Sequence, residues 1–98
     1  MKREMELHHP GEILKIEVIE GRGLTIGKTA GLLGITRPTL SNILNGKAAI
    51  TPNIALRLET VFGGTARFWV RLQSSYELFI AEKNFLENPP EIKHFDFA

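Results

Sequence analysis

The sequence contains no cysteine, a single tryptophan and a single tyrosine among its 98 residues. Disulfide bonds and thiolate metal sites are therefore excluded, and packing must hold the fold, alone or with a second copy of the chain. No apolar run approaches the ~20 residues that a membrane-spanning helix needs, and the first residues, MKREMELHHP, lack the apolar stretch of a secretion signal. We expect one small domain that works in the cytoplasm.

Acidic residues are absent from the middle of the chain. Residues 21–58 contain no Asp or Glu, and their five basic residues give this window a charge of +5, although the whole chain carries only +1. A solvated surface usually mixes both signs, so this distribution predicts that something negatively charged lies against part of the window. The five basic residues are Arg22, Lys28, Arg37, Lys47 and Arg57.

Hydrophobic periodicity and cap residues predict an all-α fold of five helices without a β-sheet. The expected helices run from His9–Glu12 to Gly21, from Thr25 through Leu33, from Thr36 to Asn45, from Thr51 and Pro52 as far as Gly63, and from Thr65 to about Lys83. Residues 1–83 form the predicted domain, and residues 84–98, which include Pro89 and Pro90, form a C-terminal tail.

The core is predicted from apolar residues at three- and four-residue steps. The first helix contributes Ile13, Leu14 and Val18, with Ile16 left open; the later segments contribute Ile26, Ala30, Leu33, Ile35, Leu40, Ile43, Leu44, Ile54, Ala55, Leu58, Val61, Phe62, Trp69, Leu72, Tyr76, Phe79 and Ile80.

Pro38 lies in the first turn of the third helix, where its missing N–H would have had no helical partner. The residue before a proline avoids helical geometry, so either Thr36 or Arg37 caps this helix. The helix before it, a turn through Gly34 and this helix form a helix-turn-helix, with the small Ala30 where the two must approach closely. The proline stiffens the helix end that such a motif presents to DNA bases.

Three segments in the same order carry a family resemblance. They are HPGEIL at 9–14, LLGITRPTLSNILNGKAAITPNIALRLETVFG at 32–63 and FWVRLQSSYEL at 68–78. Together they resemble the HigA-type antitoxins, which are also labelled virulence-associated protein I and have phage-repressor-like helix-turn-helix domains. The resemblance implies a five-helix domain that dimerises, binds an operator in its own promoter and pairs with a ribosome-associated, mRNA-cleaving toxin.

The resemblance also implies a set of DNA-binding residues, and their chemistry fits that role. Arginine can bond guanine, asparagine can bond adenine, threonine can touch a thymine methyl, and lysine and helix N-termini can hold phosphates. Related domains often carry a base-reading glutamine where this chain has Pro38, so readout shifts to Arg37, Thr39 and Asn42. The full set is Thr36, Arg37, Thr39, Ser41 and Asn42 on the exposed helix face, Asn45 and Lys47 beside the phosphates, and Thr25 and Lys28 at the preceding helix start.

Several residues allow two interpretations. The aromatic residues of the fifth helix are either core residues or a dimer contact, which we place at Trp69, Leu72, Tyr76 and Phe79. Arg22 and Arg57 are either ordinary surface charges or phosphate contacts. The helix from Thr25 is expected to be the softest element, because it carries Gly27, Gly31 and the polar Thr29. Phe95 and Phe97 in the tail either form a strand added to a partner or fray.

No catalytic or metal-binding constellation is present in the sequence. No nucleophile, base and orienting group occur together, so we expect no enzyme. His8 and His9 have no third metal ligand placed beside them, and no cofactor is expected. We therefore interpret the chain as a dimeric, DNA-binding antitoxin that represses its own operon and neutralises a toxin RNase. The alternatives are a repressor without a toxin and a protein-interaction module that does not bind DNA.

Overall fold

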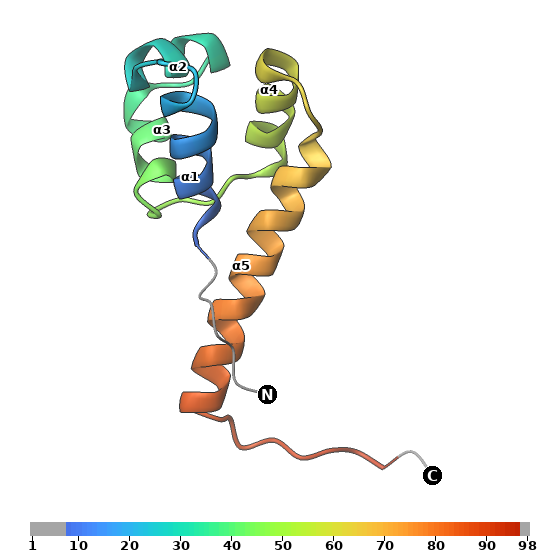
Figure 1. Ribbon diagram of the computed structural model, residues 1–98. Coiled ribbons are helices and arrows are strands. Elements are labelled where there is room, and N and C mark those ends of the chain that lie inside the picture. The colour runs from blue at the N-terminus through green and yellow to red at the C-terminus, as the bar shows by residue number, and fades with distance from the viewer. Residues whose placement is uncertain (1–7, 97–98) are drawn as a thin grey trace.

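The computed structural model describes residues 8–96, and this part of the chain contains helices without strands, which confirms the all-α fold class (Figure 1). Residues 1–7 of the predicted domain, and Phe97 in the predicted tail, lie outside the described residues. Because η1 continues α1 without a break, the five predicted helices are all present. The elements are α1 (Pro10–Ile13), η1 (Leu14–Glu20), α2 (Ile26–Leu33), α3 (Arg37–Leu44), α4 (Pro52–Phe62) and α5 (Ala66–Glu87).

The first helix changes its geometry part-way, since η1 is a π-helix whose amides bond the carbonyl five residues earlier. At its end, Gly21 N donates to Ile16 O at 3.0 Å and Leu24 N donates to Ile19 O at 2.9 Å. The wider turn brings Ile19, five residues after Leu14, into the core, where its side chain is 3% exposed. Ile16 is 50% exposed, so an inward position for that residue is wrong.

A threonine side chain caps each of the four later helices by accepting a hydrogen bond from the amide three residues further on. The caps are Thr25, Thr36, Thr51 and Thr65. Thr36, rather than Arg37, is thus the cap of α3, and Pro38 lies in its first turn. The helix ends at Leu44, one residue earlier than predicted, and Asn45 is its C-cap.

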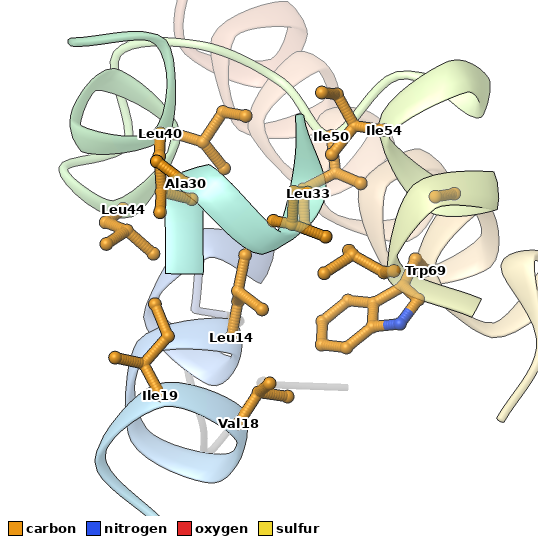
Figure 2. Close-up of a cluster of buried hydrophobic side chains, with 13 residues drawn as sticks. Leu14, Val18, Ile19, Ala30, Leu33, Leu40, Leu44, Ile50, Ile54 and Trp69 are labelled. Carbon is orange, nitrogen blue, oxygen red and sulfur yellow. The ribbon is translucent and has the colours of Figure 1, made fainter. Parts of the chain in front are cut away.

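The core lies between the helices, and η1 and each of α2 to α5 contribute a buried side chain to it (Figure 2). Leu14, Leu40 and Leu58 are fully buried at its centre, and Trp69 closes it from α5. The prediction for Val61 is wrong, because its side chain is 36% exposed in the groove between α2 and α4. The residues of the core are Leu14, Val18, Ile19, Ala30, Leu33, Leu40, Ile43, Leu44, Ile50, Ile54, Ala55, Leu58 and Trp69.

The long helix α5 packs on the other helices only through its first half (Figure 1). Its second half extends away from them, so the molecule measures 56 × 28 × 23 Å. The helix ends at Glu87 rather than near Lys83, because nothing interrupts it before the Asn88–Pro89–Pro90 segment. Ile80 lies beyond the packed half and is 36% exposed, so its predicted core position is wrong. No helix within residues 8–96 is long and apolar enough to span a membrane.

Candidate nucleic-acid interface

The start of α3 is a rigid, solvent-exposed helix end. Thr36 Oγ1 accepts a hydrogen bond from Thr39 N at 3.2 Å, and the two threonine hydroxyls lie 2.7 Å apart in a second hydrogen bond. Pro38 fixes one backbone angle in the same turn. Arg37, Pro38 and Thr39 are all exposed. The end of this helix therefore presents polar side chains that its own cap already orients.

One side of α3 faces solvent and the opposite side faces the core. Leu40, Ile43 and Leu44 are buried, whereas Asn42 is exposed one turn after Thr39. Ser41 is half-buried, and its Oγ accepts a hydrogen bond from Asn45 Nδ2 at 3.4 Å. The exposed side thus carries the predicted base-reading residues Arg37, Thr39 and Asn42, with Ser41 at its edge.

The loop after α3 is folded back onto the helix end. Asn42 O accepts hydrogen bonds from Lys47 N at 2.8 Å and from Ala48 N at 3.2 Å. Gly46 allows this turn because its φ is +75°, in the left-handed region that favours glycine. The exposed Lys47 and Asn45 consequently lie directly beside the end of α3.

The start of α2 is a second exposed helix N-terminus. Thr25 Oγ1 accepts from Lys28 N at 3.1 Å, and the side chain of Lys28 is exposed. Thr29 is fully buried, and its hydroxyl donates to Thr25 O at 2.8 Å. A helix N-terminus with a neighbouring lysine attracts phosphate, because the helix dipole and the unpaired N–H groups favour an anion.

The cations of this region are not neutralised by nearby acids. Among residues 8–96, no carboxylate lies within ion-pairing distance of Lys28, Arg37 or Lys47. Glu12, which precedes this window in the sequence, is paired with His8, whose Nδ1 lies 3.1 Å from its Oε2. The positive charge that the sequence predicted for residues 21–58 is therefore available to an anionic partner at α3 and at the start of α2.

Comparisons with known proteins agree with this geometry. Residues 16–69 match the family model described as helix-turn-helix. The chain is 37% identical to virulence-associated protein I of Dichelobacter nodosus over 83 residues, which are 85% of this chain and 77% of that protein. It is 32% identical to antitoxin HigA-1 of Vibrio cholerae serotype O1, over 85% of this chain and 78% of that protein.

The chain belongs to the HigA family of helix-turn-helix antitoxins. Its fold is also similar to the Pseudomonas aeruginosa antitoxin HigA, which was solved with the higBA promoter. That comparison has a TM-score of 0.84 and a sequence identity of 30%, and it covers 93% of this chain and 100% of the other. The resemblance that the sequence motifs predicted is thereby confirmed.

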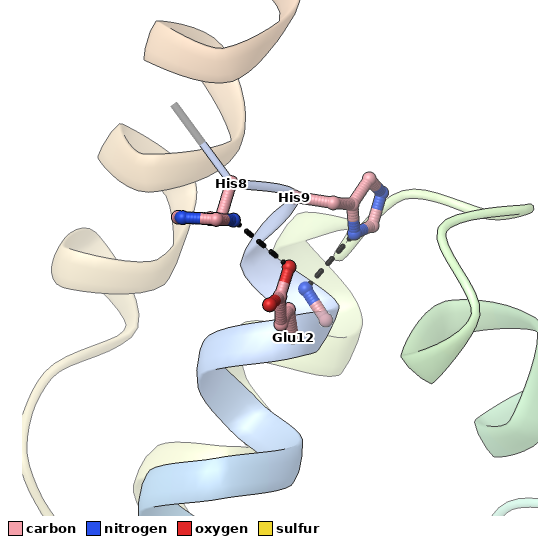
Figure 3. Close-up of polar contacts among 4 residues, drawn as sticks. His8, His9 and Glu12 are labelled. Carbon is pink, nitrogen blue, oxygen red and sulfur yellow. Dashed lines mark hydrogen bonds and ion pairs between the residues drawn. The ribbon is translucent and has the colours of Figure 1, made fainter. Parts of the chain in front are cut away.

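In this HigA family member, His9 and Gly11 join the first helix to the end of α3, a role that sequence reasoning missed. His9 Nδ1 accepts from Gly11 N at 2.9 Å, while His8 bonds Glu12 (Figure 3). A side chain at Gly11 would overlap the carbonyl oxygen of Ile43, so only glycine permits this close approach. The consecutive residues His9, Pro10 and Gly11 are the feature of the sequence that marks this position.

The His9 ring also reaches α5, where it meets Tyr76 edge-on with 5.1 Å between ring centroids. Burial lowers the pKa of His9 below its ordinary value, and a hydrogen bond to the Ala48 backbone and the charge of Glu77 oppose this shift. The neutral ring is therefore part of the packed structure. His9 thus connects the first helix, the loop after α3 and α5.

Gln73 is a second unpredicted link between α5 and the loop after α3. Its side chain is 7% exposed, and Oε1 accepts from Ile50 N at 2.8 Å. Nε2 donates to Glu77 Oε2 at 3.1 Å. The amide group therefore pairs a buried backbone N–H just before α4 that would otherwise have no partner.

The residues predicted for a dimer contact differ in how much surface they offer. Trp69 is 7% exposed and packs in the core, whereas Leu72, Tyr76 and Phe79 are half-buried along α5. Residues 88–96 have no regular structure, and the choice between fraying and a strand added to a partner is still open for this tail. Arg22 lies over the ring of Phe62, 5.5 Å from its centroid, in line with an ordinary surface position.

Proposed function

We propose that the chain is a DNA-binding antitoxin, which represses its own operon as a dimer and neutralises a toxin RNase by forming a complex with it. The observation that carries the proposal is the exposed face of α3, where Arg37 has no carboxylate within ion-pairing distance among residues 8–96 and Thr39 and Asn42 are exposed beside it. The related Pseudomonas aeruginosa HigA, which was solved with the higBA promoter, supports DNA binding by this chain. A repressor meets its operator in the cytoplasm, where we place the protein.

Each residue of the interface has a chemical role in this proposal. Arg37 can bond both acceptors of a guanine, Asn42 can bond an adenine, and the methyl group of Thr39 can contact a thymine. Thr36 and Ser41 border these contacts. Phosphate contacts fix the position of the helix in the groove without reading sequence, and we assign them to Asn45, Lys47, Thr25 and Lys28.

A dimer accounts for tight operator binding better than one helix does. Two recognition helices about 34 Å apart match one turn of DNA and imply an inverted-repeat site. We place the contact on α5, where Leu72, Tyr76 and Phe79 follow each other at four- and three-residue steps and Leu86, 81% exposed, continues the row. Trp69 supports this helix from the core.

Residues 1–83 are the proposed DNA-binding domain, and residues 84–98, whose first residues continue α5 to Glu87, are the C-terminal segment.

Titration of a labelled fragment of the gene's own promoter, followed by fluorescence anisotropy at several salt concentrations, tests DNA binding. We expect Arg37→Ala and Asn42→Ala each to weaken binding by roughly 10- to 100-fold, the value of a good base contact of about 1–3 kcal/mol. Arg67→Ala and Asn84→Ala are matched controls, because both side chains are exposed on α5. A dimer that contacts about three phosphates per subunit gives a logarithmic salt slope of roughly −5, and a monomer roughly −3.

A wild-type protein that binds its promoter no better than unrelated DNA defeats the repressor proposal and favours the protein-interaction module. The toxin partner needs a separate experiment. Co-expression with the neighbouring reading frame, followed by a pull-down and a growth assay, should show a stable complex and relief of toxicity. If the neighbouring product neither binds nor inhibits growth, the chain is a repressor without a toxin.

A further inference from the structure

Arg57 on α4 reaches across to the turn of the helix-turn-helix. Its Nη1 donates to Leu33 O at 2.9 Å and to Gly34 O at 3.2 Å. Its Nε donates to Asn53 Oδ1 at 2.8 Å, one helical turn earlier on α4. The guanidinium group is therefore held from both sides, by its own helix and by the end of α2.

The two carbonyl groups that Arg57 binds belong to a helix end that lacks donors. Leu33 is the last residue of α2, and Gly34 is its C-cap with φ +69° in the left-handed region. The last carbonyl groups of a helix have no partner within the helix and carry the negative end of its dipole. A charged guanidinium supplies both the missing donors and the opposite charge, which makes these hydrogen bonds strong.

The turn that Arg57 holds determines where α3 begins, since Thr36, the cap of α3, follows Gly34 by two residues. We propose that Arg57 is a positioning residue for DNA recognition, which fixes this turn and thereby the orientation in which Arg37 and Asn42 meet the bases. The inference rests on the proposed function, because it concerns how the same helix is held. It gives Arg57 a role other than a surface charge or a phosphate contact.

The hydrogen bonds argue against a phosphate contact. Three of the five N–H donors of the guanidinium are used within the protein. Asn53, which is exposed and uncharged, adds no positive charge near DNA but restrains the arginine. Its removal therefore distinguishes a held guanidinium from one that simply adds charge near DNA.

The test uses four variants of the full chain in the promoter titration against salt, namely Arg57→Ala, Arg57→Lys, Asn53→Ala and the double variant that combines Arg57→Ala with Asn53→Ala. We expect Arg57→Ala to weaken operator binding about tenfold through loss of charged hydrogen bonds at the turn. The salt slope should stay unchanged, because no phosphate contact is lost. Arg57→Lys keeps the charge but lacks the planar fork by which Nε and Nη1 reach Asn53 and the two carbonyl groups together, so it should also bind more weakly than wild type. Asn53→Ala should weaken binding two- to fivefold and add little to Arg57→Ala, since both act on one contact.

Hydrogen exchange of the Gly34 and Ile35 amides, which donate to Gly31 O and Ala30 O, gives a readout that does not depend on DNA. These amides should exchange faster in Arg57→Ala and in Asn53→Ala than in wild type. Phe62→Ala is the control for general destabilisation, because Phe62 packs on the core at the other end of α4. That variant should lose stability while it keeps its salt slope, its operator affinity and its protection at the turn.

Two results overturn the positioning role while wild-type binding stands. In the first, Arg57→Ala reduces the salt slope by roughly 2, which corresponds to one lost phosphate contact in each subunit, while Asn53→Ala binds like wild type. This result would identify Arg57 as a phosphate contact. The other is wild-type operator affinity in Arg57→Ala. A wild-type protein that ignores the promoter overturns the proposed function itself, and the positioning role falls with it.

Discussion

Two glycines of α2 offer a way to stabilise the protein without changing its fold. Gly27 lies in the first turn of α2 and Gly31 in its interior, and a Cβ added at either position meets nothing within 4 Å. Neither residue has a positive φ, so alanine can adopt the backbone conformation without strain. Replacement by alanine should therefore remove the entropic penalty of glycine in a helix and add no clash.

The expected gain follows from the position of each glycine. Glycine costs about 0.5–1 kcal/mol relative to alanine within a helix, so we expect up to about 1 kcal/mol at Gly31 and about 0.5 kcal/mol at Gly27, nearer the helix end. A gain of about 1.5 kcal/mol raises the Tm of a domain of this size by roughly 6 to 12 °C. Thermal unfolding followed by circular dichroism, with urea unfolding of the same samples, measures both quantities.

The same substitution at two other glycines should have the opposite sign. Gly34→Ala places a side chain at φ +69°, and Gly11→Ala drives a methyl group into the Ile43 carbonyl. Both should lower the Tm. If the double variant Gly27→Ala and Gly31→Ala melts at or below the wild-type temperature, the reasoning from open space and helix propensity is refuted, and so is the expectation that α2 is the softest element.

Three further predictions concern single hydrogen-bonding groups. Thr36→Ala removes the cap of α3, so urea unfolding should show a free energy of unfolding lower by about 1 kcal/mol and anisotropy should show weaker operator binding. Thr60→Ala, on the exposed side of α4, is the control and should change neither quantity. Because the folded pKa of His9 lies below the ordinary 6.5, its stabilising contribution is present above pH 6.5 and is lost as the pH falls through the folded pKa. His9→Asn, which can still cap the helix, should make the free energy of urea unfolding depend less on pH between 7.5 and 5, and an unchanged pH dependence contradicts the assignment. Gln73→Ala leaves the Ile50 N–H without its protein partner and should cost about 1–3 kcal/mol, with faster exchange of that amide; wild-type stability would show that water replaces the side chain.

The parts of the fold that depend on local sequence could be predicted. Thr25, Thr36, Thr51 and Thr65 cap helices because a hydroxyl can bond the amide three residues later, and this needs no knowledge of the rest of the chain. The exposed face of α3 follows from helical periodicity alone, since the same period that buries Leu40 and Ile43 exposes Asn42. The placement of these helices as a helix-turn-helix could also be read from the family motifs.

The contacts that hold the candidate site together could not be predicted, because they join distant segments. Arg57 binds carbonyl groups more than 20 residues earlier, and Gln73 binds an amide more than 20 residues earlier. Neither partner is marked by its side chain, since a backbone carbonyl or amide is present at every position. The π-helical turn likewise brings Ile19 into a core that it shares with residues of the later helices, so the three- and four-residue periodicity of the first helix could not indicate it.

The concentration of basic residues in residues 21–58 has a consequence for handling the protein. Although the chain carries a net charge of only +1, no acidic residue stands among the five basic residues of this window. A polyanion meets the local charge rather than the average over the whole molecule. The protein should therefore be retained on heparin or a cation exchanger at low ionic strength, and it should leave a cell lysate with nucleic acid attached unless that lysate is first brought to high salt.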